Sequence, residues 1–210
     1  PGVRRLVTCT LVNDLGAPAL SWHYQSQEML TLIKYVGGDE AVGRRAAEAA
    51  KSEMAGTLHR AAKEIVHRAA TYHCDIGIEE LAEGEETSGM PQVMAFEKAP
   101  VMAAPQAAFF LAPFNFFHAD LATLCRASGV PEPVLIEPSY TSTTCPVCWE
   151  VNRYSRSGDS FRCSNCTYEA QADENAAHVI GMLAWTKLTS GVVAPAEDVE
   201  QLSAEAHPPQ

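Results

Sequence analysis

The residues with the clearest chemical signature are four cysteines in two close pairs. A C-P-V-C and a C-S-N-C sequence, separated by the fourteen residues 149–162, supply the thiols of Cys145, Cys148, Cys163 and Cys166. Each C-x-x-C turn directs two sulfurs at one point, and four thiolates bind Zn²⁺ tetrahedrally. Because four protein ligands leave no open coordination position, such a zinc is structural rather than catalytic. The alternative, two redox-active pairs, requires a βαβ setting that the surrounding pattern lacks.

Two acidic residues stand at the ends of predicted core elements. Glu79 lies near the end of a buried-looking strand, IGIEEL, on the same face as Gly77 and Leu81. A carboxylate in such a strand is unfavourable unless it is paired or bound to a metal. Asp173 opens a predicted helix, where free N–H groups and the helix dipole favour an anion. The alternatives are a surface residue at a strand end for Glu79 and a plain N-cap for Asp173.

Five further residues near these motifs could contact a ligand or nucleic acid. Arg153 and Arg156 can contact phosphate, although exposed arginines are as often only solvated. Trp149 can stack on a base, although packing against the cysteine module is the favoured interpretation. Asn175 can orient a ligand or water, or bond locally within the first helical turn. His178 is interpreted as a hydrogen-bonded helix residue rather than a ligand.

The spacing of apolar residues predicts the elements that hold these groups in place. The expected strands are 3–13, 18–25, 74–81 and 134–140, and the expected helices are 40–73, 114–127 and 170–187. Ser128 and Gly129 close the second helix, and a loop or short helix is expected at 83–108. Residues 149–162 resemble a β-hairpin, so 141–168 are predicted to form a zinc ribbon. This order predicts an α/β layer architecture with a mixed sheet and a ribbon inserted before the final helix.

Length and charge narrow the class of protein. The 210 residues, of which 47% are hydrophobic, suffice for one domain or one domain plus a small module. Fifteen basic against 26 acidic residues give a net charge of -11, which argues against a simple nucleic-acid binder because phosphate contacts need basic side chains. No apolar run approaches the roughly 20 residues of a membrane helix, and no signal-peptide pattern is present. Seven cysteines, an odd number, favour metal ligation plus buried thiols in a reducing cytosol.

The order of these motifs resembles the C-terminal half of the RuvC-like nuclease domain of TnpB-type transposon proteins and type V CRISPR effectors. The resemblance extends over about residues 1–187 and is carried by IGIEEL at 76–81, EPSYTSTTCPVC at 137–148, FRCSNC at 161–166 and ADENAA at 172–177. In that family a zinc ribbon is inserted between the second and third RuvC motifs, as it is predicted to be here.

The resemblance implies an RNase H-like (RuvC) mixed sheet flanked by helices, and DNA cleavage with divalent metal ions held by Asp, Glu and Asp. Glu79 then matches the second motif and Asp173 the third, as catalytic ligands of Mg²⁺, with Asn175 supporting them and the cysteines on structural Zn²⁺. The first-motif Asp would stand immediately before Pro1, so we expect the upstream part of the same polypeptide to supply it with the first strand. Residues 1–140 would begin the core, 141–168 form a ribbon of the target nucleic-acid-loading type, 169–190 complete the core, and 191–210 form a disordered acidic tail.

The resemblance also implies the function of an RNA-guided effector of the prokaryotic cytoplasm, with guide RNA and target DNA as partners and no membrane association. One alternative is a guided effector on the same fold that silences DNA without cutting it. Another is an unrelated zinc-ribbon interaction module of transcription or translation. In the family a Gly commonly follows each cysteine pair, so Trp149 and Thr167 are expected to strain a left-handed backbone. Residues 82–113 correspond to a region that covers the site, and a gating role there is a hypothesis.

Overall fold

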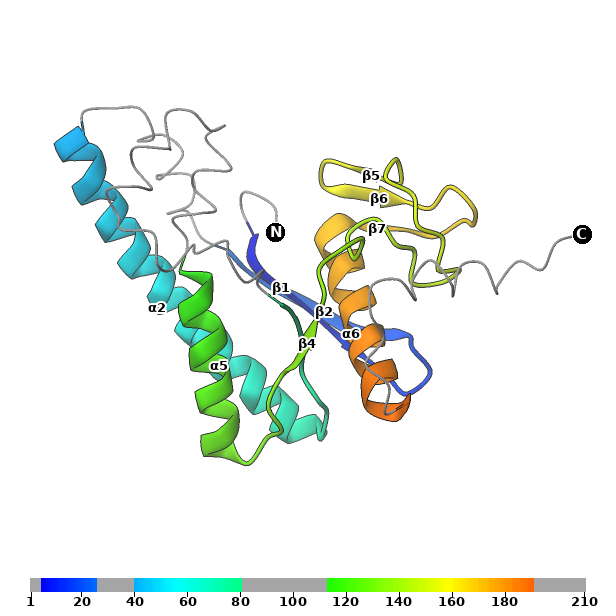
Figure 1. Cartoon of the computed structure of the whole chain (residues 1–210), viewed down its shortest axis with the longest axis horizontal. Coiled ribbons are helices and arrows are strands. Elements are labelled where there is room, and N and C mark those ends of the chain that lie inside the picture. The colour runs from blue at the N-terminus through cyan, green and yellow to red at the C-terminus, as the bar shows by residue number, and fades with distance from the viewer. Residues whose placement is uncertain (1–4, 26–39, 81–112, 191–210) are drawn as a thin grey trace, which may run out of the picture. The chain divides into compact units, whose positions relative to one another are not determined.

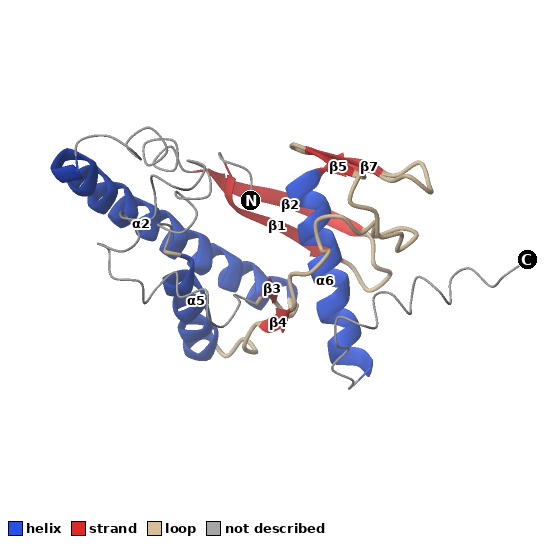
Figure 2. Cartoon of the chain, turned by 45° about the horizontal axis from the view of Figure 1, so that its top comes forward, coloured by secondary structure: helices blue, strands red, loops and turns tan. Residues whose placement is uncertain are grey.

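The computed structural model describes residues 5–25, 40–80 and 113–190 (Figure 1). Helices and strands alternate in the predicted order, which gives a mixed α/β fold (Figure 2). The elements are β1 (Arg5–Val12), β2 (Pro18–Gln25), α2 (Glu40–Tyr72), β3 (Gly77–Glu79), α5 (Phe114–Ser128), β4 (Val134–Ile136), β5 (Arg156–Ser157), β6 (Ser160–Arg162), β7 (Glu169–Gln171) and α6 (Ala172–Ser190). The loop predicted at 83–108 and the tail at 191–210 lie outside the described residues. Within those residues, no helix is long and apolar enough to cross a membrane.

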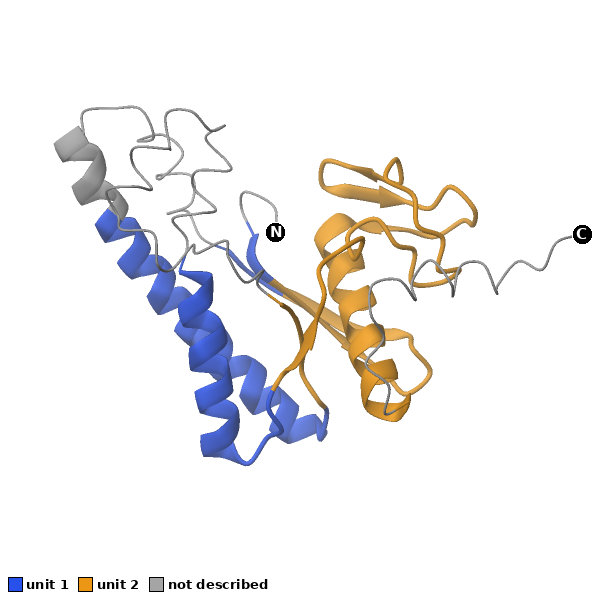
Figure 3. Cartoon of the chain, viewed as in Figure 1, with its two compact units in different colours: residues 1–7, 23–74, 81–132 blue, residues 8–22, 75–80, 133–210 orange. Residues whose placement is uncertain are grey.

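The described residues fall into two compact units (Figure 3). The first contains residues 5–7, 23–25, 40–74 and 113–132, and the second contains residues 8–22, 75–80 and 133–190. All the site residues predicted from the sequence belong to the second unit.

The first unit is built on the packing of α2 against α5. Buried side chains recur along α2 at helical spacing, from Met54 and Leu58 to Val66. On α5 the buried positions Phe117, Leu121 and Cys125 are spaced four apart, which places them on one face. The two helices are also joined by a hydrogen bond of 2.7 Å between Nδ1 of His59 and Oδ2 of Asp120. As the sequence predicted, α5 ends at a left-handed Gly129, with φ at 68°.

The second unit has a parallel strand pair against a helix. Gly77 pairs with Val134 and Glu79 with Ile136, and α6 lies against both strands. Lys187 Nζ donates to the carbonyl of Leu135 at 3.1 Å, near the C-terminal end of α6. The closest approach is at Gly77, where an added Cβ would lie 2.6 Å from the Cβ of Ala184. The absence of a side chain at Gly77 therefore sets how closely β3 approaches α6.

The predicted ribbon is a three-stranded antiparallel sheet with β6 in the middle. The turn between β5 and β6 contains Gly158 with φ at 58°, a conformation that glycine adopts without strain. The prediction that the final helix begins at residue 170 was wrong, because residues 170 and 171 belong to β7 and α6 starts at Ala172. The amide of Ala172 donates to the carbonyl of Asp159 at 2.9 Å, which ties the first residue of α6 to the hairpin turn.

Candidate metal centres

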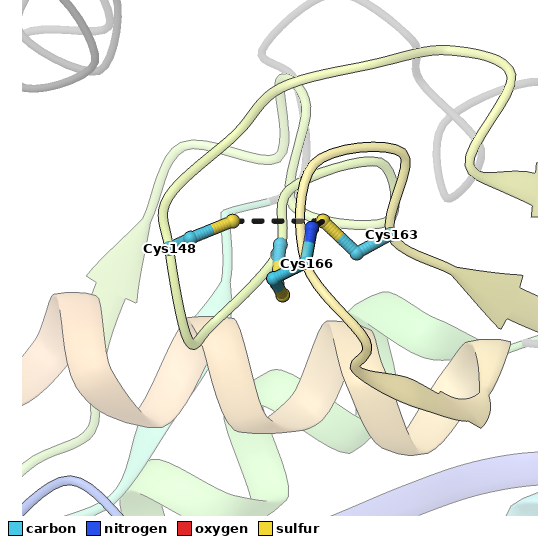
Figure 4. Close-up of side chains that lie close together, drawn as sticks. Cys148, Cys163 and Cys166 are labelled. Atoms are coloured by element: carbon cyan, nitrogen blue, oxygen red, sulfur yellow. Dashed lines mark hydrogen bonds between the residues drawn. The ribbon is translucent and has the colours of Figure 1, made fainter. Parts of the chain in front are cut away.

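The four cysteines converge on one point. Figure 4 labels three of them, Cys148, Cys163 and Cys166. All four sulfurs lie within 4.8 Å of one another, with 3.7 Å between Cys145 and Cys166 and 3.5 Å between Cys148 and Cys163. A tetrahedral zinc with Zn–S bonds of about 2.3 Å separates its sulfurs by about 3.8 Å. The spacing and the all-sulfur donor set therefore fit one zinc ion.

The thiols of the cysteine turns differ in pKa, and a thiol must ionise to bind a metal. Burial raises the pKa of the Cys145 thiol to about 12 and also raises that of Cys148. Burial opposes ionisation of Cys163 as well. It is outweighed there by backbone N–H groups of Asn165 and Cys166, each 3.4 Å from the sulfur, and by neighbouring thiols, so the pKa falls to about 7. Cys163 thus ionises more readily than Cys145 and Cys148, and a metal must displace protons from these two thiols.

Glu79 is the last residue of β3, and its side chain is half-buried. Its Oε1 accepts a hydrogen bond of 2.7 Å from the hydroxyl of Thr141, a residue that is only 2% exposed. A freely solvated strand-end carboxylate would have no such buried donor. The structure therefore argues against the alternative that Glu79 is a solvated surface residue at a strand end.

Asp173 lies in the first turn of α6 and is 5% exposed. The interpretation of Asp173 as a plain N-cap is wrong, because Gln171 occupies that position. Gln171 Oε1 accepts hydrogen bonds from the amides of Asp173 at 2.8 Å and Glu174 at 2.9 Å. The carboxylate of Asp173 instead lies 3.4 Å from Nη2 of Arg156, on the ribbon strand β5.

One turn connects the surroundings of the two carboxylates. Residues 138–144 follow β4, and Thr141 within them donates to Glu79. The carbonyl of Thr144 accepts a hydrogen bond of 2.9 Å from Nδ2 of Asn175, two residues after Asp173. Since Leu135 lies near the end of α6 and Thr144 near its start, β3 and β4 run opposite to α6. Glu79 and Asp173 therefore stand at the same end of this layer.

Both carboxylates carry the donor chemistry of a divalent cation site. Magnesium prefers anionic oxygen ligands, and Glu79 and Asp173 present such oxygens in half-buried and buried positions. Among the described residues, the cysteine quartet is the only cluster of three or more potential metal ligands. The described part of the chain thus supplies two carboxylates and no third beside them.

Asn175 and His178 are both integrated into the core of the second unit. Asn175 is fully buried and bonds 31 residues away rather than locally, while its Oδ1 has no hydrogen-bond partner among the described residues. Nε2 of His178 is 2.7 Å from the carbonyl of Gly16, which can only accept, so the proton lies on Nε2. This agrees with the predicted structural role of His178.

The candidates for nucleic-acid contact are placed differently from one another. Arg156 is 29% exposed and directed toward Asp173, whereas the Arg153 guanidinium lies 4.7 Å from the centroid of the Tyr154 ring. Trp149 is half-buried, and its φ of 59° confirms the expected left-handed backbone; Thr167 has no positive φ, so that expectation was wrong. Sequence reasoning missed Tyr154, which is 75% exposed. An aromatic residue next to an arginine in the ribbon hairpin was the available signal.

Comparison with known proteins gives a match for the segment that contains α5, β4, the ribbon and the first half of α6. Residues 114–180 match the family model described as Cas12f1-like, TNB domain. The chain is similar in fold to a chain in the cryo-EM structure of the Cas12f1-sgRNA-target DNA complex, with a TM-score of 0.58 and 16% sequence identity. The similarity covers 86% of this chain and 47% of that one, so this chain spans about half of that chain's length. No curated protein matches the chain. Residues 114–180 are therefore similar to a Cas12f1-like TNB domain, which confirms the resemblance to a TnpB-type or type V effector region predicted from the sequence.

Proposed function

We propose that this chain is part of an RNA-guided DNA-targeting effector whose RNase H-like, RuvC-type domain hydrolyses DNA. Glu79 and Asp173 would be the catalytic carboxylates that hold Mg²⁺, and Cys145, Cys148, Cys163 and Cys166 would hold a structural Zn²⁺ in a zinc ribbon. The partners would be a guide RNA, which reads sequence by base pairing, and the target DNA.

The observation that carries this proposal is the anchoring of both carboxylates around one turn and one helix. Glu79 is held by Thr141 at 2.7 Å, and Asp173 lies two residues before Asn175, which holds Thr144 at 2.9 Å. A carboxylate pair is destabilised by its own repulsion until a cation binds, so two such residues at one end of a layer favour a cation site. Neither fold class nor charge alone would support this function.

The side chains of this end of the layer have separate roles in the proposed reaction. The chemistry that bound Mg²⁺ supplies at such sites is the activation of water and the stabilisation of the leaving oxygen of a phosphodiester. Glu79 and Asp173 would provide its anionic ligands. Arg156, 3.4 Å from Asp173, would offer its N–H groups to a phosphate bound beside that carboxylate. Arg153 and Trp149 stay candidates for contact with nucleic acid elsewhere on the ribbon.

The pairing of β3 supports a contribution from the upstream part of the same polypeptide. Within the described residues β3 is paired only with β4, in a two-stranded parallel sheet. Parallel sheets of two strands are rarely stable alone, since three or more strands are usually needed to bury a face. We infer that a further strand pairs with the other edge of β3 and carries the third carboxylate.

The test is plasmid cleavage by the full-length protein with guide RNA and Mg²⁺. Glu79→Ala and Asp173→Ala are each expected to abolish cleavage while guide-dependent binding of target DNA persists. Glu80→Ala is the matched control, because Glu80 is the neighbouring carboxylate and is exposed. Cleavage by both alanine variants at the wild-type rate would refute the assignment.

A guided effector on the same fold that silences without cutting is the second candidate, because the observations above apply equally to it. If the wild-type protein binds guide and target tightly but does not cleave in Mg²⁺ or Mn²⁺, this second function is the correct one. Zinc content, measured by elemental analysis, is expected to be one ion per chain in either case.

A further inference from the structure

The hydroxyl of Thr141 has a choice of two acceptors. Its Oγ1 lies 2.7 Å from Oε1 of Glu79 and 3.1 Å from the carbonyl of Pro138. A hydroxyl carries one proton, and an ionised carboxylate is the stronger acceptor, so the proton is donated to Glu79. The side chain of Thr141 is buried, which protects this bond from competition with water.

The position of Thr141 is fixed by contacts that do not involve Glu79. Its amide donates to the carbonyl of Pro138 at 3.4 Å, and the hydroxyl of Thr144 donates to the carbonyl of Tyr140 at 2.8 Å. Asn175 then joins the turn to α6 through the carbonyl of Thr144. The Thr141 hydroxyl that donates to Glu79 is therefore held in place by α6, the helix that carries Asp173.

We propose that Thr141 is a positioning residue for Glu79, an inference that rests on the proposed function. Its hydroxyl holds Oε1 and so selects one orientation of a side chain that could otherwise rotate about three bonds. Oε2 and the remaining lone pair of Oε1 are then available to a divalent cation, at a place set relative to α6. Residues that orient metal ligands in this way typically alter metal affinity by about 10–100-fold when they are removed.

The test uses the full-length protein and two measurements of metal binding. The dissociation constant for Mn²⁺ is measured from the EPR signal of the free ion, and the Mg²⁺ requirement is the concentration that gives half-maximal cleavage. Thr141→Val keeps the shape and removes the donor, and it is expected to raise both values by about 10-fold or more. Thr141→Ser keeps the donor and is expected to stay near the wild-type values.

The matched control is Thr143→Val. It makes the same chemical change in the same turn, but the hydroxyl of Thr143 donates to the carbonyl of Tyr140, at 3.2 Å. It is expected to bind Mn²⁺ as the wild type does.

Each alternative outcome has a distinct meaning. Wild-type Mn²⁺ affinity in Thr141→Val, with affinity lost in Glu79→Ala, overturns the positioning role and leaves the proposed function intact. Equal losses in Thr141→Val and Thr143→Val mean that the turn has unfolded, and they also overturn it. If Glu79→Ala changes neither Mn²⁺ binding nor cleavage, the proposed function fails and the positioning role fails with it.

Discussion

Replacement of Gly77 by alanine tests the geometry that places Glu79 beside α6. The added Cβ would lie 2.6 Å from the Cβ of Ala184 and 3.3 Å from the carbonyl oxygen of Ile180. Two carbon atoms in contact are normally about 3.5–4.0 Å apart, so β3 and α6 must separate by about 1 Å. Neither obstacle is the end of a flexible side chain, so the strain cannot be relieved by a rotamer change.

The expected loss of stability for Gly77→Ala is about 2 kcal/mol, within the range measured for overpacked cores. For a chain of this length this corresponds to a melting temperature lower by about 4–8 °C. Glu79 stands two residues along the same strand and moves with it. A displacement of about 1 Å in a catalytic group can lower a rate by about 100-fold. We therefore expect a large loss of cleavage rate even at temperatures where the Gly77→Ala protein is still folded.

The assay is thermal unfolding and plasmid cleavage of three variants. Ala184→Gly in the Gly77→Ala background removes the carbon that obstructs the new methyl group, and it should recover part of the lost stability. Gly56→Ala is the control, because its Cβ would meet only Nη1 of Arg60 at an ordinary 3.7 Å; in helix α2 it should stabilise by up to about 1 kcal/mol. A Gly77→Ala protein that melts with the wild type, or no recovery in the double variant, would refute the close packing of β3 on α6.

Three further predictions follow from local features. Zinc affinity, measured with a competing chelator, is expected to weaken as pH falls from 8 to 6, because the raised pKa values of Cys145 and Cys148 mean that zinc must displace their protons; Cys145→Ser should lower bound zinc below one equivalent. Tyr140 has φ at 65° and an exposed side chain, so Tyr140→Asn should raise the urea midpoint by relieving up to about 1 kcal/mol of strain. Burial lowers the pKa of the His118 imidazole below its unfolded value of about 6.5. The contribution of His118 to the stability of the fold is therefore fully present above about pH 6.5, where the imidazole is neutral, and it is lost as pH falls through the folded pKa. His118→Phe should flatten the decline in unfolding free energy measured between about pH 7 and 5.

The features that sequence reasoning placed correctly are those set by local rules. The C-x-x-C turns fix their own geometry. Apolar periodicity predicted the helices at 40–72 and 114–128 to within a few residues of their ends, and Gly129 marked the end of the second one. The candidate carboxylates were selected because a motif order, rather than any single residue, marked them, and their role stays a prediction. Their immediate surroundings depend on atoms distant in sequence, which no local rule describes.

The features missed at Asn175 and Asp173 depend on long-range contacts or on competition between neighbours. The bond from Asn175 to Thr144 joins residues 31 apart, so a local interpretation of Asn175 could not find it. Gln171 and Asp173 can both cap a helix, and Asp is the better residue by statistics. The tertiary contact of Asp173 with Arg156 leaves the cap to Gln171.

The ribbon and the carboxylate end of the layer are physically connected, so zinc bound by the four cysteines would have an effect beyond the ribbon itself. Three contacts join them: Arg156 to the Asp173 carboxylate, the carbonyl of Asp159 to the amide of Ala172, and Asn175 to the carbonyl next to Cys145. The ribbon's own core is small, consisting of Phe161 and Tyr168 around the cysteines, so we expect its fold to depend on a bound metal. A zinc ion bound by the four cysteines would therefore act on the first turn of α6 by fixing the residues that touch Asp173, although a four-thiolate zinc site has no position open to a substrate.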